Sequence, residues 1–493
     1  MSTITKEQLA QSFVDERLPK RSIVGYGFGD FANNLAFTLS TAFLLYYYTD
    51  VAGLSAAAVA TMFFVVRLWD AFADIFAGRL VDRTMTRMGK FRPFILFGAV
   101  PLLFLSFLTF HVPSSLDDGA KLLYAYVTYA ALGLLYSLVN IPYGSLASAM
   151  TQSVKERAKL VSSRFFGGAV GGIVLTYIIA PKISALKGEK QTLTSAQYQE
   201  KVQAIFTQTT LLFIVIGSLA YLVTWYFCRE QVVRTTPRVS VRETWDTLRG
   251  NKPLGYLCAA SFFYLIGLFA VGGASAYYAQ YVMGDIKWLG PITLVNSGIS
   301  IVAAPFIPKL VDRFGKKALF QWCGVFTVVG GVALFFTPTG AAAPALIFLG
   351  IKGIGAALIN TVMFGLEADT VEYGEWKSGK RSEGATYAVF SFTRKITQSI
   401  GGAVGAAALA FGGYLSASSS VPNPVQPESA LDAIRFTIGL LPAIVALIAM
   451  LIFWKYPLTD DRFREVRNET EFRKRQQGHL IAPDGHVIDT PKI

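Results

Sequence analysis

The sequence predicts an all-α membrane protein with twelve transmembrane helices in two six-helix halves. Of its 493 residues, 53% are hydrophobic and only 16% are charged, whereas soluble proteins average about 25% charged residues. The 38 Phe and 44 Gly are typical of helices packed against one another in lipid. Twelve apolar segments are each long enough to cross a bilayer, which takes roughly 20 residues.

The expected spans follow one another along most of the chain. They lie near residues 23–48, 55–78, 93–112, 122–146, 160–181, 208–228, 255–284, 290–308, 318–338, 342–366, 385–414 and 434–456. A polar, basic stretch separates the sixth span from the seventh and divides the chain into halves. The expected units are an N-terminal segment (1–22), a first half (23–228), a central loop (229–254), a second half (255–457) and a tail (458–493).

The basic residues are distributed unevenly around these spans. If the N-terminus lies inside, 33 of the 45 Lys and Arg fall in inside segments, 7 fall in outside loops and 5 fall within spans. This is the positive-inside bias, so we expect both termini to be cytoplasmic. The net charge of +13 therefore orients the protein in its membrane and does not indicate nucleic-acid binding.

Several other classes of protein are excluded by what the sequence lacks. The N-terminal stretch MSTITKEQLAQSFVDERLPKRS has no cleavable signal. Cys228, Cys258 and Cys323 stand alone, so we expect no disulfide, no organic cofactor and no metal site apart from a bound Na⁺. The sequence has no nucleophile–base constellation of an enzyme, and the tail is too short for a receptor's signalling domain. Transport by a monomer is the remaining expectation, with an oligomer left open.

A weak internal repeat supports the division into halves. GRLVDRTMTRMGK (78–90) and PKLVDRFGKK (308–317) each follow the second span of their half. Acids flanked by basic residues and glycine turns can clamp the cytoplasmic ends of neighbouring helices. We therefore expect a gating role for the pairs Asp82 with Arg83 and Asp312 with Arg313.

Three charges stand inside the second span, in RLWDAFADIFAGRLVDR (67–83). Arg67, Asp70 and Asp74 are spaced i, i+3 and i+7, which places them on one helix face. A lone charge at the centre of a bilayer costs about 2.5–3.5 kcal/mol on insertion scales. The two carboxylates can share a proton or bind a small cation, with Lys395, about 15 Å deep in span eleven, neutralising them when empty. The alternative is a static Arg67–Asp70 pair.

Other polar residues are expected around a cavity near the middle of the membrane. Together they suit a hydroxyl-rich ligand, because hydroxyls both donate and accept hydrogen bonds, although any one of them can equally join two helices. Lys352 can instead be a side chain that reaches the outer interface. The residues are Asp30, Asn33, Asn34, Tyr136, Ser137, Asn140, Arg164 and Lys352.

Six motifs carry a resemblance to a known family. They are YYYTDVAGLS (46–55), WDAFAD (69–74), MGKFRPFIL (88–96), NIPYGSL (140–146), EADTVEYGEWKSGKRSEG (367–384) and SFTRK (391–395). On these, residues 23–457 resemble the glycoside–pentoside–hexuronide:cation symporters, which include the melibiose permeases, within the major facilitator superfamily. YGFGDFANN and YSLVNIPYGSLASAMTQ look closest to bacterial glucuronide carriers. The resemblance implies the bacterial cytoplasmic membrane, a sugar substrate and a co-transported H⁺ or Na⁺.

The resemblance also implies roles for individual residues. Asp70 and Asp74 match the family's cation-site aspartates, and Ser137 matches its hydroxyl ligand. Lys395 matches the lysine that links the cation and sugar sites. The matches at sugar-site positions are Arg164, Tyr136 and Ser391.

Two departures from the family pattern bear on the substrate. The melibiose permeases have aspartates at the positions of Asn34 and Asn140, and a Trp at the position of Gly144. Without those acids an anionic ligand is not repelled, and Arg164, Lys395 and Lys352 can face a carboxylate. This favours symport of a β-glucuronide or another hexuronide. A neutral glycoside or a xyloside-like pentoside remains compatible, and a membrane sugar sensor is the alternative from another class.

Overall fold

The computed structural model describes residues 17–151, 154–186, 194–230, 249–303, 306–379, 383–416, 425–476, 480–481 and 487–488. Almost all of this part of the chain is helical, which confirms the all-α prediction. The exception is a short antiparallel pair in the tail, β1 (Leu480–Ile481) with β2 (Val487–Ile488). The side chain of Asp82 lies outside the described residues.

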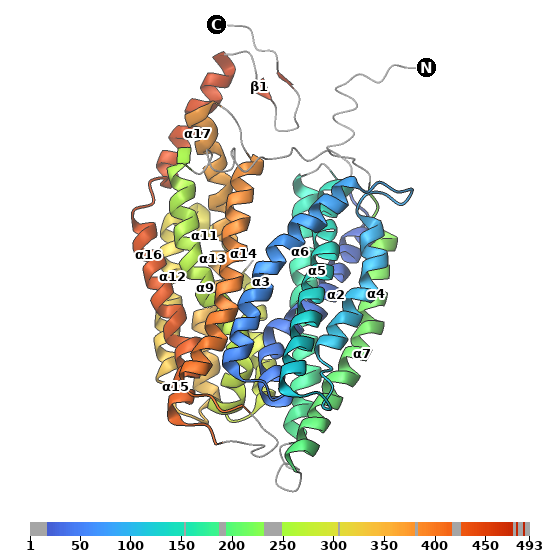
Figure 1. Cartoon of the computed structure of the whole chain (residues 1–493). Coiled ribbons are helices and arrows are strands. Elements are labelled where there is room, and N and C mark those ends of the chain that lie inside the picture. The colour runs from blue at the N-terminus through green and yellow to red at the C-terminus, as the bar shows by residue number, and fades with distance from the viewer. Residues whose placement is uncertain are drawn as a thin grey trace.

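The helices form two groups that stand side by side (Figure 1). The first group is α2 (Lys20–Tyr46) with the π-helical turn η1 (Tyr47–Val51), α3 (Ala56–Arg83), α4 (Arg92–Thr109), α5 (Asp118–Met150), α6 (Val154–Ala185) and α7 (Ser195–Phe227). The second group is α9 (Lys252–Tyr277), η3 (Tyr278–Val282), η4 (Ile286–Trp288), α10 (Leu289–Ala303), α11 (Ile307–Phe314), α12 (Lys316–Phe335), α13 (Ala342–Ser378), α14 (Glu383–Phe411), α15 (Glu428–Arg435), η6 (Phe436–Leu440), α16 (Leu441–Trp454) and α17 (Asp460–Gln476).

The two groups touch each other along three pairs of helices. These pairs are α3 with α14, α6 with α10, and α2 with α9. The groups diverge toward the end that carries α17 and converge toward the end that carries η1 and η3 (Figure 1). We call these the α17 end and the η end. The division of the chain into moving halves remains a prediction.

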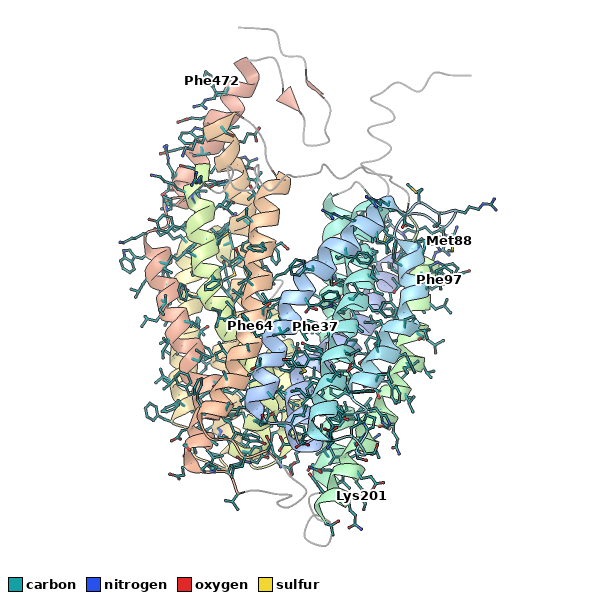
Figure 2. All side chains as sticks on the ribbon, in the orientation of Figure 1. Phe37, Phe64, Met88, Phe97, Lys201 and Phe472 are labelled. Carbon is teal, nitrogen blue, oxygen red and sulfur yellow. The ribbon has the colours of Figure 1, made fainter. Side chains whose placement is uncertain are left out.

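Ten of the described helical segments are long and apolar enough to cross a membrane. They confirm a multi-pass membrane protein. Their outer faces are apolar, as at Phe97 on α4, which points away from the bundle and is 67% exposed (Figure 2). Helices α2 and α14 are not among the ten, because Asp30, Asn34 and Lys395 belong to a polar lining that lowers their hydropathy. The count of twelve spans therefore stays a prediction.

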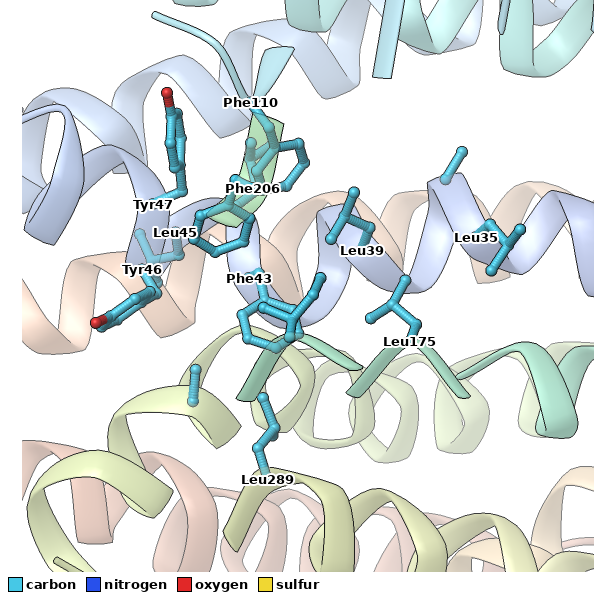
Figure 3. Close-up of a cluster of buried hydrophobic side chains, with 14 of the residues drawn as sticks. Leu35, Leu39, Phe43, Leu45, Tyr46, Tyr47, Phe110, Leu175, Phe206 and Leu289 are labelled. Atoms are coloured by element: carbon cyan, nitrogen blue, oxygen red, sulfur yellow. The ribbon is translucent and has the colours of Figure 1, made fainter. Parts of the chain in front are cut away.

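The hydrophobic core differs between the two ends of the molecule. One cluster joins the groups: Phe43 and Tyr47 of the first group belong to it together with Leu289 of the second. Its aromatic centre packs Phe43 edge-on against Phe206, with ring centroids 5.7 Å apart (Figure 3). A second cluster contains residues of α9 to α17 only. The η end is thus sealed by side chains from both groups.

The same local structure recurs at the η end of both groups. Each first helix ends in a π-helical turn, YYTDV at η1 and YAQYV at η3. Each turn is followed by a glycine with positive φ, Gly53 (79°) and Gly284 (90°), a conformation that only glycine adopts without strain. Asp50 and Tyr281 hold the same position in the two turns, the fourth of five.

The LVDR repeat also has a structural counterpart, at the α17 end. In each group a glycine with positive φ, Gly89 or Gly315, comes shortly before the next long helix. Glu230 accepts hydrogen bonds from the backbone N–H groups of Lys90, Phe91 and Arg92, at 2.8–3.1 Å. Asp460 accepts one from Lys316 N–H at 3.2 Å. Because helix N-termini attract negative charge, Glu230 ties the segment after α7 to α4, and Asp460, the first residue of α17, ties α17 to α12.

Candidate functional site

An ion pair crosses between the two groups of helices. Lys395 Nζ on α14 donates to Asp74 Oδ2 on α3. The Lys395 side chain is 49% exposed and that of Asp74 is 20% exposed, so solvent reaches the pair. The structure thus brings together two of the residues that the sequence predicted for the cation site. The bond between Lys395 and Asp74 also links the two groups directly.

The second predicted carboxylate is held within its own helix. Arg67 Nη1 donates to Asp70 Oδ2 at 3.2 Å, and the Arg67 guanidinium lies over the Tyr129 ring. Asp70 Oδ1 is buried and has no hydrogen-bond partner among the described residues. It faces Gly133 of α5 so closely that a Cβ there would overlap it. A buried carboxylate oxygen without a donor is a position where a proton or a cation gains energy.

Two hydroxyl residues accompany these acids. Ser137, on α5, is buried, and its Oγ donates to Gly133 O of its own helix at 3.1 Å. Ser391 stands four residues before Lys395 on α14 and is half-buried, so both belong to one helix face. Among the described residues neither hydroxyl is hydrogen-bonded to Asp70 or Asp74, and their roles at the cation and sugar sites stay predictions.

A second polar cluster connects α2, α5 and α6. Arg164 Nε donates to Asp30 Oδ1 at 3.0 Å, and Arg164 Nη2 donates to Asn140 Oδ1 at 3.4 Å. Asn34 Nδ2 donates to Asp30 Oδ2 at 3.2 Å, and Asn34 Oδ1 accepts from Thr38. Arg164 remains 30% exposed. The predicted sugar-site residues Asn34, Asn140 and Arg164 therefore meet, but an acid already neutralises the arginine.

Asn33 and Tyr136 are placed differently from each other. Asn33 is fully buried, and its Oδ1 accepts from Tyr221 OH on α7 at 2.6 Å. It therefore joins two helices of the first group, and we leave it out of the substrate site. Tyr136 is half-buried and stacks on Phe37 with ring centroids 5.6 Å apart.

A cavity of about 1170 Å³ lies between the groups, along α6 and α10. On α6 its wall includes Lys159, Ser162, Ser163, Phe165, Phe166 and Ala169. Arg164 and Gly168 of the same helix instead contact residues of α2 and α5. Asp70, Asp74 and Lys395 do not line it. The cavity and the ion pairs are therefore separate features, which Thr38 connects, since it lines the cavity and donates to Asn34.

Lys352 of α13 lines this cavity and is only 6% exposed. Its Nζ donates to Ile438 O in η6 at 2.8 Å. The side chain is thus directed into the protein and does not reach the outer interface. The alternative that Lys352 is a side chain reaching the outer interface is therefore wrong.

At the η end a half-buried acid, Asp50, links the groups. Tyr281 OH donates to Asp50 Oδ1 at 2.8 Å, and Tyr414 OH lies 2.7 Å from Asp50 Oδ1 and 2.8 Å from Asp50 Oδ2. Beside them, Thr49 Oγ1 and Tyr277 OH are 2.7 Å apart. These bonds join η1 to α9, η3 and the segment after α14, and so hold the two groups together at this end.

The predicted gating residues lie at the opposite, α17 end. Arg83, Asp312 and Arg313 are exposed. The Arg313 guanidinium lies over the Phe314 ring, 5.4 Å from its centroid. Among the described residues Asp312 has no ion pair. The groups stand apart at this end (Figure 1), and Arg83, Asp312 and Arg313 form no ion pair between the groups among the described residues.

A family model described as MFS/sugar transport protein matches residues 25–460. The chain belongs to this family. Its members are membrane transporters, which confirms that the chain is a transporter and not an enzyme. Two bacterial relatives support this assignment over nearly their whole length.

The "Glucuronide carrier protein homolog" of Escherichia coli (strain K12) is 42% identical over 470 residues, covering 95% of this chain and 99% of the relative. The "Putative glycoside/cation symporter YagG" of the same organism is 32% identical and covers 95% and 98%. A solved bacterial homolog of the human lysosomal transporter Spinster superposes with a TM-score of 0.64 at 14% identity, over 91% of this chain and 98% of that one. It supports the fold alone.

Two residues of these clusters had no functional role in the sequence-based account. Asp30 was recognised as polar, but nothing in its helix revealed Arg164 as its partner. Asp50 lies in the YYYTD motif, and the recurrence of its turn as YAQYV at η3 is a signal that could have identified it. Its tyrosine partners come from distant parts of the chain.

The close approach of Gly133 to Asp70 gives a sharp test of the acid's position. In Gly133→Ala the new Cβ would displace the carboxylate from Arg67, and we expect at least a tenfold loss of cation-dependent uptake. Gly144→Ala on the same helix is the control, because its Cβ would stand at an ordinary 3.5 Å from Arg164 Nη1. Equal uptake by both variants would show that the Asp70 geometry is unimportant.

Proposed function

We propose that the chain imports a glycoside together with a cation by alternating access, with its α17 end in the cytoplasm. The observation that carries the proposal is the pairing of both intramembrane aspartates with basic side chains, Asp70 with Arg67 and Asp74 with Lys395. Each pair is neutral, which lowers the cost of charge inside the membrane. A cation that binds an aspartate must displace its basic partner.

The Asp74–Lys395 pair supplies the coupling in this scheme. The bond holds α3 of one group against α14 of the other. When the coupling cation neutralises Asp74, Lys395 is released and the balance between conformations shifts. Lys395 and Ser391 then face the space between the groups, where a substrate hydroxyl or carboxylate can take the place of Asp74.

A proton is the coupling ion that the arrangement favours. Na⁺ takes several oxygen ligands, as hard cations do, and the Ser137 hydroxyl is committed to Gly133 O in this conformation. A proton needs only one carboxylate oxygen, such as Asp70 Oδ1. Na⁺ is the alternative, and it requires Ser137 to turn toward Asp70.

The substrate we propose is a β-glucuronide or a related hexuronide. The relative named as a glucuronide carrier homolog supports this substrate. Asn34 and Asn140 support it as well, because they are neutral where the melibiose permeases have aspartates. Because Asp30 neutralises Arg164, that arginine offers donors to sugar hydroxyls. A neutral glycoside or pentoside is the alternative. Inhibition of transport by a β-glucuronide and by the matched β-glucoside distinguishes the two substrates. Equal or better inhibition by the glucoside would reject the hexuronide as substrate, and the proposal of a symporter would stand.

Transport further requires that the η end open and the α17 end close. Opening must break the bonds of Asp50 with Tyr281 and Tyr414. Closure would bring Asp82 and Arg83 at the end of α3 toward Asp312 and Arg313 of α11, at the repeated LVDR positions. These contacts would form only in the conformation opposite to the one described here.

The coupling role predicts different losses for different kinds of transport. Asp70→Asn and Asp74→Asn should each abolish accumulation of substrate against its gradient in vesicles, because the charge that the cation neutralises is gone. Exchange of internal for external substrate should persist, since it does not need the empty carrier to return. Full concentrative uptake by both variants would reject the assignment of the cation site.

The η-end bonds predict how the cavity is reached from outside. Asp50→Ala should increase labelling of a cysteine placed at Ser275 by an impermeant reagent added at the periplasmic side, by about tenfold, in a background with the native cysteines replaced. Tyr47→Phe is the matched control, since Tyr47 OH accepts from Val112 N–H inside one group. If the two variants label alike, Asp50 does not hold this end closed.

A further inference from the structure

Among the basic side chains inside the helices, Lys352 has an unusual environment. Arg67, Arg164 and Lys395 each contact a carboxylate. Lys352 has no carboxylate within ion-pair distance among the described residues; its Nζ contacts the neutral carbonyl of Ile438. A buried ammonium without a counter-ion is costly inside a membrane. Such residues persist where they serve a function.

The local sequence explains the hydrogen bond but not the charge. In an α-helix the Ile438 carbonyl would accept from the N–H four residues on, and that residue is Pro442, which has none. Ile438 lies in the π-helical turn η6, and Lys352 supplies its carbonyl with a donor that Pro442 cannot supply. A neutral donor such as a serine, threonine or glutamine side chain would do the same at a lower cost of burial. The positive charge of Lys352 therefore calls for a separate explanation.

The cavity around Lys352 shows which ligand would use that charge. Its walls carry many hydroxyl and amide side chains, among them Thr293, Asn296 and Ser297 of α10. Tyr264 OH and Thr327 Oγ1, 2.8 Å apart, line it from α9 and α12. The other basic residue of the lining, Lys159, is exposed and paired with Glu156 at 2.6 Å. Hydroxyl partners and one buried ammonium fit a sugar acid.

We infer that Lys352 binds the carboxylate of the substrate in the cavity between α6 and α10. The inference rests on the proposed hexuronide function and assigns its charge recognition to Lys352 rather than to Arg164. An ammonium has three N–H donors, and the bond to Ile438 uses one. The substrate carboxylate can therefore accept from the others while the Ile438 bond persists. Charge-assisted bonds of this kind are about twice as strong as neutral ones.

The test measures binding of 4-nitrophenyl β-glucuronide and 4-nitrophenyl β-glucoside to the purified full-length protein. Wild type should prefer the glucuronide. Lys352→Gln, which removes the charge and keeps a donor, should lose at least tenfold in glucuronide affinity and retain its glucoside affinity. Lys159→Gln, in the same cavity wall, should behave as wild type, because its charge is already paired.

A double variant separates recognition from structural support. In Lys352→Met with Pro442→Ala, residue 442 supplies the N–H that Ile438 lacks, so the structural task of Lys352 is fulfilled without a lysine. We expect this variant to bind the glucoside and still to lack the preference for the glucuronide. A wild-type preference in the double variant or in Lys352→Gln overturns the role of Lys352 and leaves the proposed function intact. A wild type that binds the glucoside as tightly as the glucuronide overturns both.

Discussion

Charge neutralisation inside the membrane-spanning helices is the constraint on which the rest of this structure depends. Asp70, Asp74 and Asp30 are each paired with a basic side chain. The pairs differ in what they connect: Arg67 lies on the same helix as Asp70, Arg164 joins two helices of one group, and Lys395 joins the two groups. Only the last pair must break if the groups are to separate along α3 and α14. In the proposed mechanism, an ion that competes for Asp74 would therefore act on the conformation of the whole molecule.

The two ends of the molecule are held by different forces. At the η end an aromatic and apolar cluster continues from one group into the other, and the half-buried Asp50 is held by Tyr281 and Tyr414. At the α17 end the groups stand apart, and Arg83 and Asp312 are exposed. Acid caps at Glu230 and Asp460 stabilise each group internally. Each group can thus remain intact while the contacts between the groups change.

In the proposed function, substrate recognition is divided between a neutral part and a charged part. Arg164 is balanced by Asp30 and presents donors beside Asn34 and Asn140, which suits hydroxyl groups. Lys352 lies on α13, in the cavity along α6 and α10, and its only partner among the described residues is a main-chain carbonyl. This division separates binding of the sugar ring from selection for a carboxylate, and it leaves Lys395 available for coupling.

Sequence reasoning located the helices well because hydropathy and spacing are properties of one segment. It placed Asp70 and Asp74 on one face of α3, and the family motifs indicated Lys395 as their partner. It failed where the outcome depends on which neighbour a helix face meets. Asn33 and Asn34 are adjacent in sequence and point about 100° apart on the helix, so one faces α7 and the other faces Asp30. The pairing of Asp50 with two tyrosines depends on tertiary contacts that no local pattern contains.

In the proposed mechanism Lys395 and the coupling ion compete for Asp74. Removing the lysine tests this competition, because the amount of ion needed for glycoside binding should then fall. The dependence of glycoside binding on Na⁺ concentration and on pH would be measured for purified wild type and Lys395→Gln. We expect Lys395→Gln to bind the glycoside at about tenfold less of the coupling ion than wild type, because Asp74 no longer has a competing partner. If Lys395→Gln needs as much of that ion as wild type, or more, the proposed competition is contradicted, since Lys395 would then support the cation site and not compete for it.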